Sequence, residues 1–344
     1  MSCSHAFCTI IPPFVLDKMA RSNRPEVAEN ARATREVSDA VRIERGARSV
    51  PRGASGEGAD AERKVYDSEN TRRQRVTQAR FESDPESGDD DVNIAFEHAG
   101  TVREYLTGSL ARNSIDGAGM DLVLNVHYGK EYNNAFWDGD EMTFGDGDGE
   151  IFTSFARSLD VTAHEIFHGV TQYLNGLVYR SQPGALNEHF SDVFGSVISQ
   201  VASGQTAHDA DWLIGNEIMG PDLPGEALRS MKAPGTAYDN DIMGADPQPA
   251  HMDDYYDGNA DNQGVHINSG IPNRAFYLVA TDIGTDKAAQ IWFAAFQGLD
   301  SRADFEDAAA ALAGAAGALT REGRAPLGST QSVRSAFRAV GISS

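Results

Sequence analysis

Residues 164–168 read His-Glu-Ile-Phe-His, an H-E-x-x-H pattern with two histidines four positions apart. Side chains at positions i and i+4 of an α-helix lie on the same face, so His164 and His168 can direct their imidazoles at one metal ion. Zinc in a hydrolytic site takes three protein ligands and keeps one position for water. Glu188 can supply the third ligand, and Glu165 can act as a general base on that water. Together these residues predict a zinc peptidase site.

Other interpretations of this pattern fit less well. One class of zinc peptidases has a third histidine six residues after the second, but Leu174 occupies that position and excludes the class. Zinc aminopeptidases place the distal glutamate one position earlier, where this chain has Asn187. A catalytically silent peptide-binding or adhesive module is a further alternative, and the intact Glu165 argues against it. A solvent-facing helix can also carry H-E-x-x-H by chance, but the acidic residues downstream favour zinc.

Two further groups of residues could support the metal. A ligating imidazole is held in one tautomer by a partner on its other nitrogen, and Asp192, one helical turn beyond Glu188, is the first candidate for this role. Asn187 is a weaker candidate. Residues 261–270 contain His266, which could donate a hydrogen bond to a developing oxyanion, with Asp261 orienting its ring. Sequence spacing alone does not place this loop near the zinc.

The surrounding pattern changes from strands to helices along the chain. Asp160 is the predicted N-cap of the histidine helix, and Gly176 is its predicted stop. The next helix is predicted from about Ala185, with Val201 among its buried residues. Apolar residues alternate as in a strand over 122–128, and residues 135–137 and 142–144 form a predicted hairpin. The glycine-rich residues 145–149 do not fit the EF-hand calcium-binding pattern, so they predict a plain turn. Other helices are predicted at 93–111, 273–282, 287–296, 303–319 and 331–340.

Length and composition indicate two lobes and a tail. The chain has 344 residues and a formal net charge of −22, which would repel nucleic acid and anionic membranes. No apolar run is long enough for membrane insertion. The only cysteines are Cys3 and Cys8, so no disulfide framework can form downstream. No standard secretory signal peptide is readable, because a basic first segment is missing and Pro12-Pro13 interrupts the apolar stretch.

The N-terminal region contains a short apolar block, residues 8–20, followed by a polar stretch, residues 21–63. The composition of the polar stretch predicts a linker. An isolated apolar block needs a surface on which to dock, so we expect a removable pro-segment that covers the site. The alternative is a poorly ordered tail with one docked helix.

At this point a family resemblance is evident. The chain resembles the thermolysin-like neutral metallopeptidases over approximately residues 100–344, and the order of the matching runs is the same. These runs are residues 133–137, 164–171, 184–195, 228–231 and 264–273. Residues 8–20, with Ile11-Pro12-Pro13, resemble the short pro-segment of the protealysin subgroup.

The resemblance implies a role for each matching residue. His164, His168 and Glu188 match the zinc ligands, and Glu165 matches the general base. Tyr179 and His266 match the oxyanion donors, with Asp261 behind His266. The residues that match peptide-binding groups are Arg229, Asn134 and the backbone of Ala135, and those that match the apolar pocket after the scissile bond are Phe152, Phe155, Val161, Ile214 and Leu228.

The same resemblance implies a secreted endopeptidase that cleaves proteins and peptides on the amino side of bulky apolar residues. It also implies a latent precursor that removes its own inhibitory pro-segment, by cleavage between about Arg45 and Tyr66. The expected fold is α+β, a two-lobed thermolysin-like zincin. Its expected parts are a pro-segment and linker at 1–60, a β-rich lobe with the H-E-x-x-H helix at 61–175, and a helical lobe at 176–344.

The chain departs from the family pattern at two places. Thermolysin binds a pair of calcium ions, and Asp160 and Asp211 match two of the acidic ligands, but Ser199, Leu213 and Asn216 replace others. One Ca²⁺ held by Asp160, Asp211 and Glu217 is still possible on this pattern. The second departure is Cys8, which is interpreted either as a small buried apolar residue or as a temporary zinc ligand in the latent form.

Overall fold

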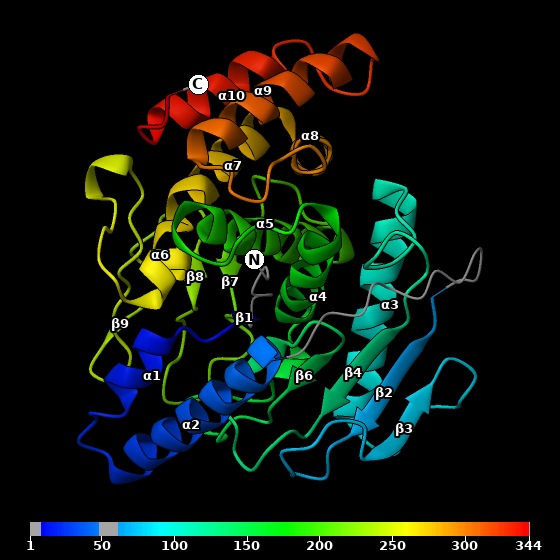
Figure 1. The fold of residues 1–344 in the computed structure, drawn as a ribbon, viewed down its shortest axis with the longest axis vertical. Helices are drawn as coiled ribbons and strands as arrows, with labels where there is room; N and C mark the ends of the chain where they lie inside the picture. The colour runs from blue at the N-terminus through cyan, green and yellow to red at the C-terminus, as the bar shows by residue number, and fades with distance from the viewer. Residues whose placement is uncertain (1–7, 48–60, 344) are drawn as a thin grey trace.

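The protein is described by a computed structural model that covers residues 8–47 and 61–343. A mixed sheet and one long helix lie at one end, the C-terminal helices lie at the other, and two helices cross between them (Figure 1). This arrangement is the expected two-lobed α+β fold. Among the described residues, no helix combines the length and the apolar character needed to span a membrane.

The sheet has six strands in the order β1-β5-β6-β4-β2-β3. Strands β2 (Arg63–Asp67), β4 (Leu122–Val126) and β6 (Met142–Phe144) are parallel, whereas β3 (Thr77–Phe81) and β5 (Ala135–Trp137) run antiparallel to their neighbours. The predicted hairpin is confirmed as β5 and β6, with Phe136 opposite Thr143. Helix α3 (Asp90–Leu110) packs on β2 and β4, and its N-cap, Asp89, accepts hydrogen bonds from two backbone amides.

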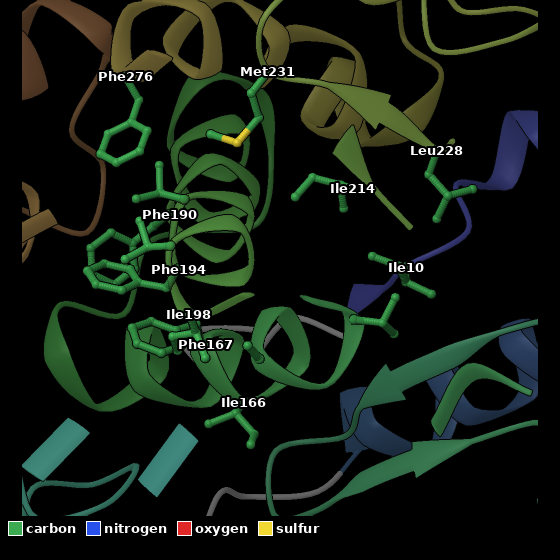
Figure 2. Packing of buried hydrophobic residues seen from close by; sticks show 14 of the residues in the cluster. Ile10, Ile166, Phe167, Phe190, Phe194, Ile198, Ile214, Leu228, Met231 and Phe276 are labelled. Carbon is green, nitrogen blue, oxygen red and sulfur yellow. The ribbon is translucent and has the colours of Figure 1, made fainter. Parts of the chain in front are cut away.

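The two helices predicted to carry the metal ligands are α4 (Leu159–Leu174) and α5 (Ser181–Ala202). Their packing rests on aromatic rings: Phe167 of α4 stacks on Phe194 of α5 with 4.2 Å between ring centroids, and Phe190 lies beside them (Figure 2). Because these rings are rigid and fully buried, they fix the relative position of the two helices. The buried side predicted for α5 fails at its end, where Val201 is 53% exposed because the last turn extends beyond the core.

The predicted N-cap of α4 is wrong. Ser158 holds the N-cap position, and Asp160 lies inside the first turn, where its carboxylate accepts hydrogen bonds from the amides of Val161 (2.6 Å) and Gly215 (2.7 Å). The acidic side chain therefore joins the start of α4 to a distant loop. The predicted stop is consistent with the structure: Gly176 has a φ of +62° and its amide bonds to Thr171.

The C-terminal lobe contains all four predicted helices: α7 (Gly270–Ile283), α8 (Thr285–Phe296), α9 (Phe305–Arg321) and α10 (Ser329–Ala339). A further helix, α6 (Asp261–Asn268), precedes them. The other short elements are the strand pair β7 (Leu213–Ile214) and β8 (Arg229–Ser230), the pair β9 (Asp239–Asn240) and β10 (Gly244–Ala245), and the 3-10 turns η1 (Phe155–Arg157) and η2 (Met252–Asp254).

The N-terminal region differs from the predicted linker. Strand β1 (Cys8–Thr9) joins the edge of the sheet beside β5, and α1 (Pro13–Met19) and α2 (Pro25–Ala47) follow it. Helix α2 is rich in Ala, Glu and Arg, which are good helix formers, and it buries a narrow stripe that includes Val27 and Ala31. The linker prediction rested on the polar composition of this stretch. The stretch is helical because tertiary contacts to its small apolar stripe stabilise the helix. Residues 48–60 of the predicted linker lie outside the described residues.

Candidate metal centre and catalytic site

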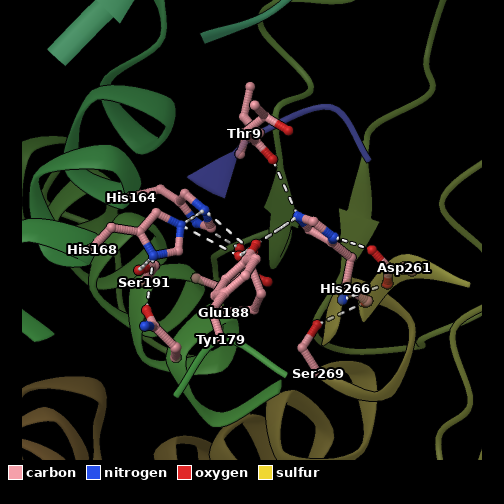
Figure 3. A network of polar contacts seen from close by, with 12 residues as sticks. Thr9, His164, His168, Tyr179, Glu188, Ser191, Asp261, His266 and Ser269 are labelled. Carbon is pink, nitrogen blue, oxygen red and sulfur yellow. Dashed lines mark hydrogen bonds and ion pairs between the residues drawn. The ribbon is translucent and has the colours of Figure 1, made fainter. Parts of the chain in front are cut away.

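The three predicted metal ligands converge between α4 and α5 (Figure 3). The Nε2 atoms of His164 and His168 are 2.9 Å apart, and the Glu188 carboxylate oxygens lie 3.5 Å and 3.4 Å from these two nitrogens. All three side chains are buried. Four-coordinate zinc with bonds of about 2.0–2.1 Å holds its ligand atoms about 3.3 Å apart, which is close to this triangle.

The donor set also fits a cation on chemical grounds. Two imidazole nitrogens and a carboxylate face one another in a buried space, where at most one imidazole hydrogen can lie between the two rings. Oxygen Oε2 of Glu188 is buried and accepts no hydrogen bond from the described residues. A buried carboxylate oxygen without a hydrogen bond is costly, so a divalent ion at this point would satisfy all three groups.

Each histidine has a partner on its other nitrogen. Oxygen Oδ1 of Asp192 lies 2.9 Å from Nδ1 of His164, and Asn187 Oδ1 lies 2.8 Å from Nδ1 of His168. Sequence reasoning missed Ser191, whose hydroxyl is 3.2 Å from the same nitrogen of His168. Its position on α5, three residues after Glu188 and directly before Asp192, was the only available signal.

Asp192 is the centre of a larger buried network. Arg229 donates to its carboxylate at 2.8–3.1 Å, and Asn273 donates to Oδ2 at 2.9 Å. Burial alone would raise the pKa of Asp192, but the charge of Arg229 and the contact with His164 outweigh burial and hold the pKa well below its usual range. Asp192 therefore stays ionised. The contribution of Asn273 has no signal in the sequence, because it depends on how α7 packs on α5.

Glu165 is fully buried. Burial, followed by the negative charge of Glu188, raises the pKa of Glu165 well above its usual value. A carboxylate in this environment has a high affinity for a proton. That property is what a general base beside a metal centre needs.

The structure brings the second predicted cluster to the metal centre. Nε2 of His266 lies 3.5 Å from Glu188 Oε1 and 3.2 Å from the Tyr179 hydroxyl, and the Tyr179 hydroxyl donates a short hydrogen bond to Glu188. His266 belongs to α6 instead of a loop. The backbone of residues 261–264 has positive φ throughout and forms a left-handed turn at the start of this element. The sequence pattern of an ordinary right-handed helix is therefore missing there.

Asp261 positions the His266 ring. Its Oδ1 is 2.6 Å from Nδ1, and its Oδ2 accepts from the amides of His266 and Ile267. Burial would lower the pKa of His266, but the charges of Asp261 and Glu188 prevail and raise it to about 9. The ring is thus protonated at neutral pH and can donate from Nε2.

The residues predicted to bind a peptide contact the chain's own N-terminal segment. The Ile10 amide donates to the Ala135 carbonyl at 3.2 Å, and Asn134 exchanges hydrogen bonds with the amide (2.9 Å) and carbonyl (3.3 Å) of Ile11. Arg229 Nη1 donates to the Ile10 carbonyl at 3.3 Å. Nε2 of His266 is 3.1 Å from the Thr9 carbonyl (Figure 3).

The residues of the predicted apolar pocket are buried in the same apolar cluster as this segment. Ile10 is fully buried and belongs to one continuous apolar cluster with Ile214 and Leu228, which lie on the same side of that cluster (Figure 2). Phe155 of η1 and Val161 of α4 are fully buried members of this cluster. Phe152 lies next to Phe155, with 5.8 Å between ring centroids.

The possible calcium ligands line a hollow of about 310 Å³ on the far side of α4's first turn. Asp160 uses its carboxylate on backbone amides, while Asp211 and Glu217 are exposed. In the part of the chain that the structure describes, these three residues do not form a set of ligand atoms within 4.8 Å of one another.

The fold and the donor set together are those of a two-lobed zinc metallopeptidase. Residues 52–172 match the family described as "Thermolysin metallopeptidase, catalytic domain", and residues 175–342 match "Thermolysin metallopeptidase, alpha-helical domain". The chain belongs to the thermolysin family of metallopeptidases.

Individual relatives agree with this assignment. The chain is 42% identical to an "Extracellular metalloprotease" of Pectobacterium carotovorum subsp. carotovorum over 88% of each chain. It is 40% identical to a thermolysin of Alicyclobacillus acidocaldarius over 71% of this chain and 44% of that protein. Its structure is similar to that of the precursor of protealysin, a metalloproteinase from Serratia proteamaculans, with a TM-score of 0.86, 40% identity, and coverage of 98% of this chain and 100% of that one.

These findings confirm three predictions from the sequence: the thermolysin-like family with its protealysin-like subgroup, the two-lobed fold, and the metalloendopeptidase activity. The protein is a zinc-dependent endopeptidase. Nothing in the comparisons supports a catalytically silent binding module.

Proposed function

We propose that this endopeptidase uses His164, His168 and Glu188 to hold one catalytic Zn²⁺, with Asp192 and Asn187 fixing the two imidazoles. The observation that carries this proposal is the convergence of side chains from α4, α5 and α6 on the Glu188 carboxylate. When bound, zinc would act as a Lewis acid toward the peptide carbonyl and would make water acidic enough to lose a proton near neutral pH.

The other site residues act on protons and on the developing charge. Glu165 accepts the proton of the attacking water and passes it to the leaving amine. His266 and Tyr179 donate hydrogen bonds to the oxygen that becomes negative, and Asp261 keeps His266 protonated and correctly oriented. Donors fixed in a buried site stabilise this charge without reorganisation, which is why such groups contribute strongly to catalysis.

The substrate lies along β5 as an added antiparallel strand. In this proposal, Asn134 and Ala135 bind its backbone, and Arg229 binds the carbonyl of the residue after the scissile bond. Phe155, Val161, Ile214 and Leu228 form the pocket for that residue's side chain. Because the pocket is lined by apolar groups, cleavage occurs on the amino side of bulky apolar residues in proteins and peptides.

The first part of the chain acts as an intramolecular inhibitor. Residues 9–11 occupy the same hydrogen-bonding groups that a substrate needs. The chain after this segment is attached elsewhere, for example through Arg24, which lies between α1 and α2 and pairs with Glu150 at 2.7 Å and with Asp222. The proposed parts are a pro-segment and linker at 1–60 and two lobes at 61–175 and 176–344, with self-cleavage between about residues 45 and 66.

Two further proposals concern the location of the enzyme and a second metal. The relatives named extracellular favour secretion of the mature enzyme. One Ca²⁺ near Asp160, Asp211 and Glu217 would stabilise the first turn of α4.

A single comparison tests the central proposal. The full chain and its Glu165→Ala variant are expressed, and metal content and N-terminal trimming are followed by mass spectrometry. We expect one zinc in both proteins, but trimming and casein digestion only in the wild type. Equal casein digestion by the variant would refute the role of Glu165, and an absence of bound zinc in both proteins would refute the metal site. A blocked peptide separates the activities further, because an endopeptidase cuts it and an aminopeptidase does not.

A further inference from the structure

The N-terminal strand lies in the active site in the register of a substrate; this statement rests on the proposed function. The Thr9 carbonyl contacts His266, the Ile10 carbonyl contacts Arg229, and the Ile10 side chain is buried with the pocket residues. With those roles, the Thr9–Ile10 peptide bond occupies the scissile position. A segment held in this way should be cut, unless the attacking water is kept away.

Cys8 is the residue in a position to exclude that water. Strand β1 pairs antiparallel with β5, with Cys8 opposite Trp137, and side chains at alternate positions of a strand project to the same face. Cys8 and Ile10 therefore project to the same face of the sheet. β1 also contacts α4, the helix that carries both histidines.

The thiol reaches the metal centre itself. Cys8 is 1% exposed, and its Sγ lies in one group with a ring nitrogen of His168 and a carboxylate oxygen of Glu188, all within 4.8 Å of one another. The neighbouring Oε2 of Glu188 is buried without a hydrogen bond from the described residues. With this sulfur added, the proposed ligands of a cation here would be two imidazoles, one carboxylate and one thiolate.

This donor set completes a tetrahedral zinc site. Three protein ligands leave one coordination position for water, and a thiolate is among the strongest zinc ligands, with a bond of about 2.3 Å. Binding forms a sulfur–zinc bond and releases the thiol proton to solvent, with no oxidation or reduction. Since the fourth position can hold only one ligand, sulfur there leaves no place for the nucleophile.

We infer that Cys8 is the fourth zinc ligand of the precursor, and that it protects the substrate-like Thr9–Ile10 bond by taking the position of the attacking water. The pro-segment then inhibits the enzyme in two ways, and different residues are responsible for each. Residues 9–11 provide the contacts of a substrate, and Cys8 prevents the reaction that those contacts would otherwise permit.

The coordination is tested on the full-length Glu165→Gln protein, which remains a precursor. It is loaded with one equivalent of zinc and measured by X-ray absorption at the zinc edge. We expect one sulfur scatterer at about 2.3 Å, its loss in the added Cys8→Ser variant, and its retention in the matched Cys3→Ser variant. Zinc bound by nitrogen and oxygen alone in the protein with both cysteines would overturn the inference. Failure to bind zinc would overturn the proposed metal site as well, so the two failures are distinguishable.

The protective effect is tested with Glu165 intact. N-terminal mass spectrometry of freshly expressed full-length chains should find a product that begins at Ile10 in Cys8→Ser, but not in the wild type or in Cys3→Ser. If Cys8→Ser retains its Thr9–Ile10 bond while the casein activity of its processed form is normal, Cys8 does not protect that bond.

Discussion

Replacing Ile10 by Ala should release the pro-segment from the cleft. Ile10 is fully buried within the cluster that contains Ile214 and Leu228, so the truncation removes apolar contacts without altering any backbone hydrogen bond. Ile→Ala in a closed core costs about 2–5 kcal/mol. Water can fill the space left by the truncation, so the lost binding free energy should lie near the lower end, at about 2–3 kcal/mol. This loss corresponds to about a 30- to 150-fold increase in the fraction of molecules with an open site.

The assay is the initial rate at which the full-length chain hydrolyses a blocked fluorogenic peptide, before a shortened chain is visible on a gel. As long as most molecules are closed, this rate is proportional to the open fraction, so it should rise by the same factor. The matched control is Lys18→Ala, an exposed position on α1 that should leave the rate unchanged. A rate for Ile10→Ala within about twofold of the wild type, against the 30-fold minimum expected from burial, would show that the pocket does not hold the segment.

Three other predictions concern stability and the metal. The hydrogen bond to Asp146 raises the pKa of His127 from 6.5 to about 9. The protonated ring therefore stabilises the folded state, and this stabilisation is fully present below pH 6.5. It amounts to at most about 3 kcal/mol and disappears as the pH rises through 9. The melting temperature should therefore fall more steeply between pH 6.5 and 9.5 in the wild type than in His127→Gln; parallel curves would contradict this role. Asp192→Ala leaves the buried guanidinium of Arg229 without its carboxylate. The free energy of unfolding, measured in urea at a fixed zinc concentration, should therefore fall by about 3–5 kcal/mol. A fall of less than about 1 kcal/mol would show that Arg229 finds another partner. A chelator should abolish casein hydrolysis by the processed enzyme and one equivalent of zinc should restore it, while activity that survives complete removal of zinc would exclude a metal-dependent reaction.

Local patterns in the sequence identified the elements that depend on local physics. The four-residue spacing of His164 and His168 defines one face of a helix wherever that helix lies, and the apolar spacing of the C-terminal helices is equally local. The hairpin of β5 and β6 followed from its turn residues. The family runs then supplied roles for residues such as Tyr179 and His266, which spacing alone could not place.

The sequence failed where a structure depends on distant partners. Helix α2 is polar enough to resemble a linker, and it becomes stable because a small stripe including Val27 packs on the rest of the protein. Asp160 resembles an N-cap in isolation, but its carboxylate bonds to the amide of Gly215, far along the chain. In both cases the deciding contact has no local signature.

The sequence by itself thus determined which chemical groups are present and which of them share a helical face. Only the tertiary structure decided that α6 brings His266 to Glu188, that Arg229 pairs with Asp192, and that Cys8 lies beside the metal ligands. The physical reason is that these contacts join residues far apart in the chain. Their geometry is set by the packing of whole elements against one another, which no local periodicity encodes.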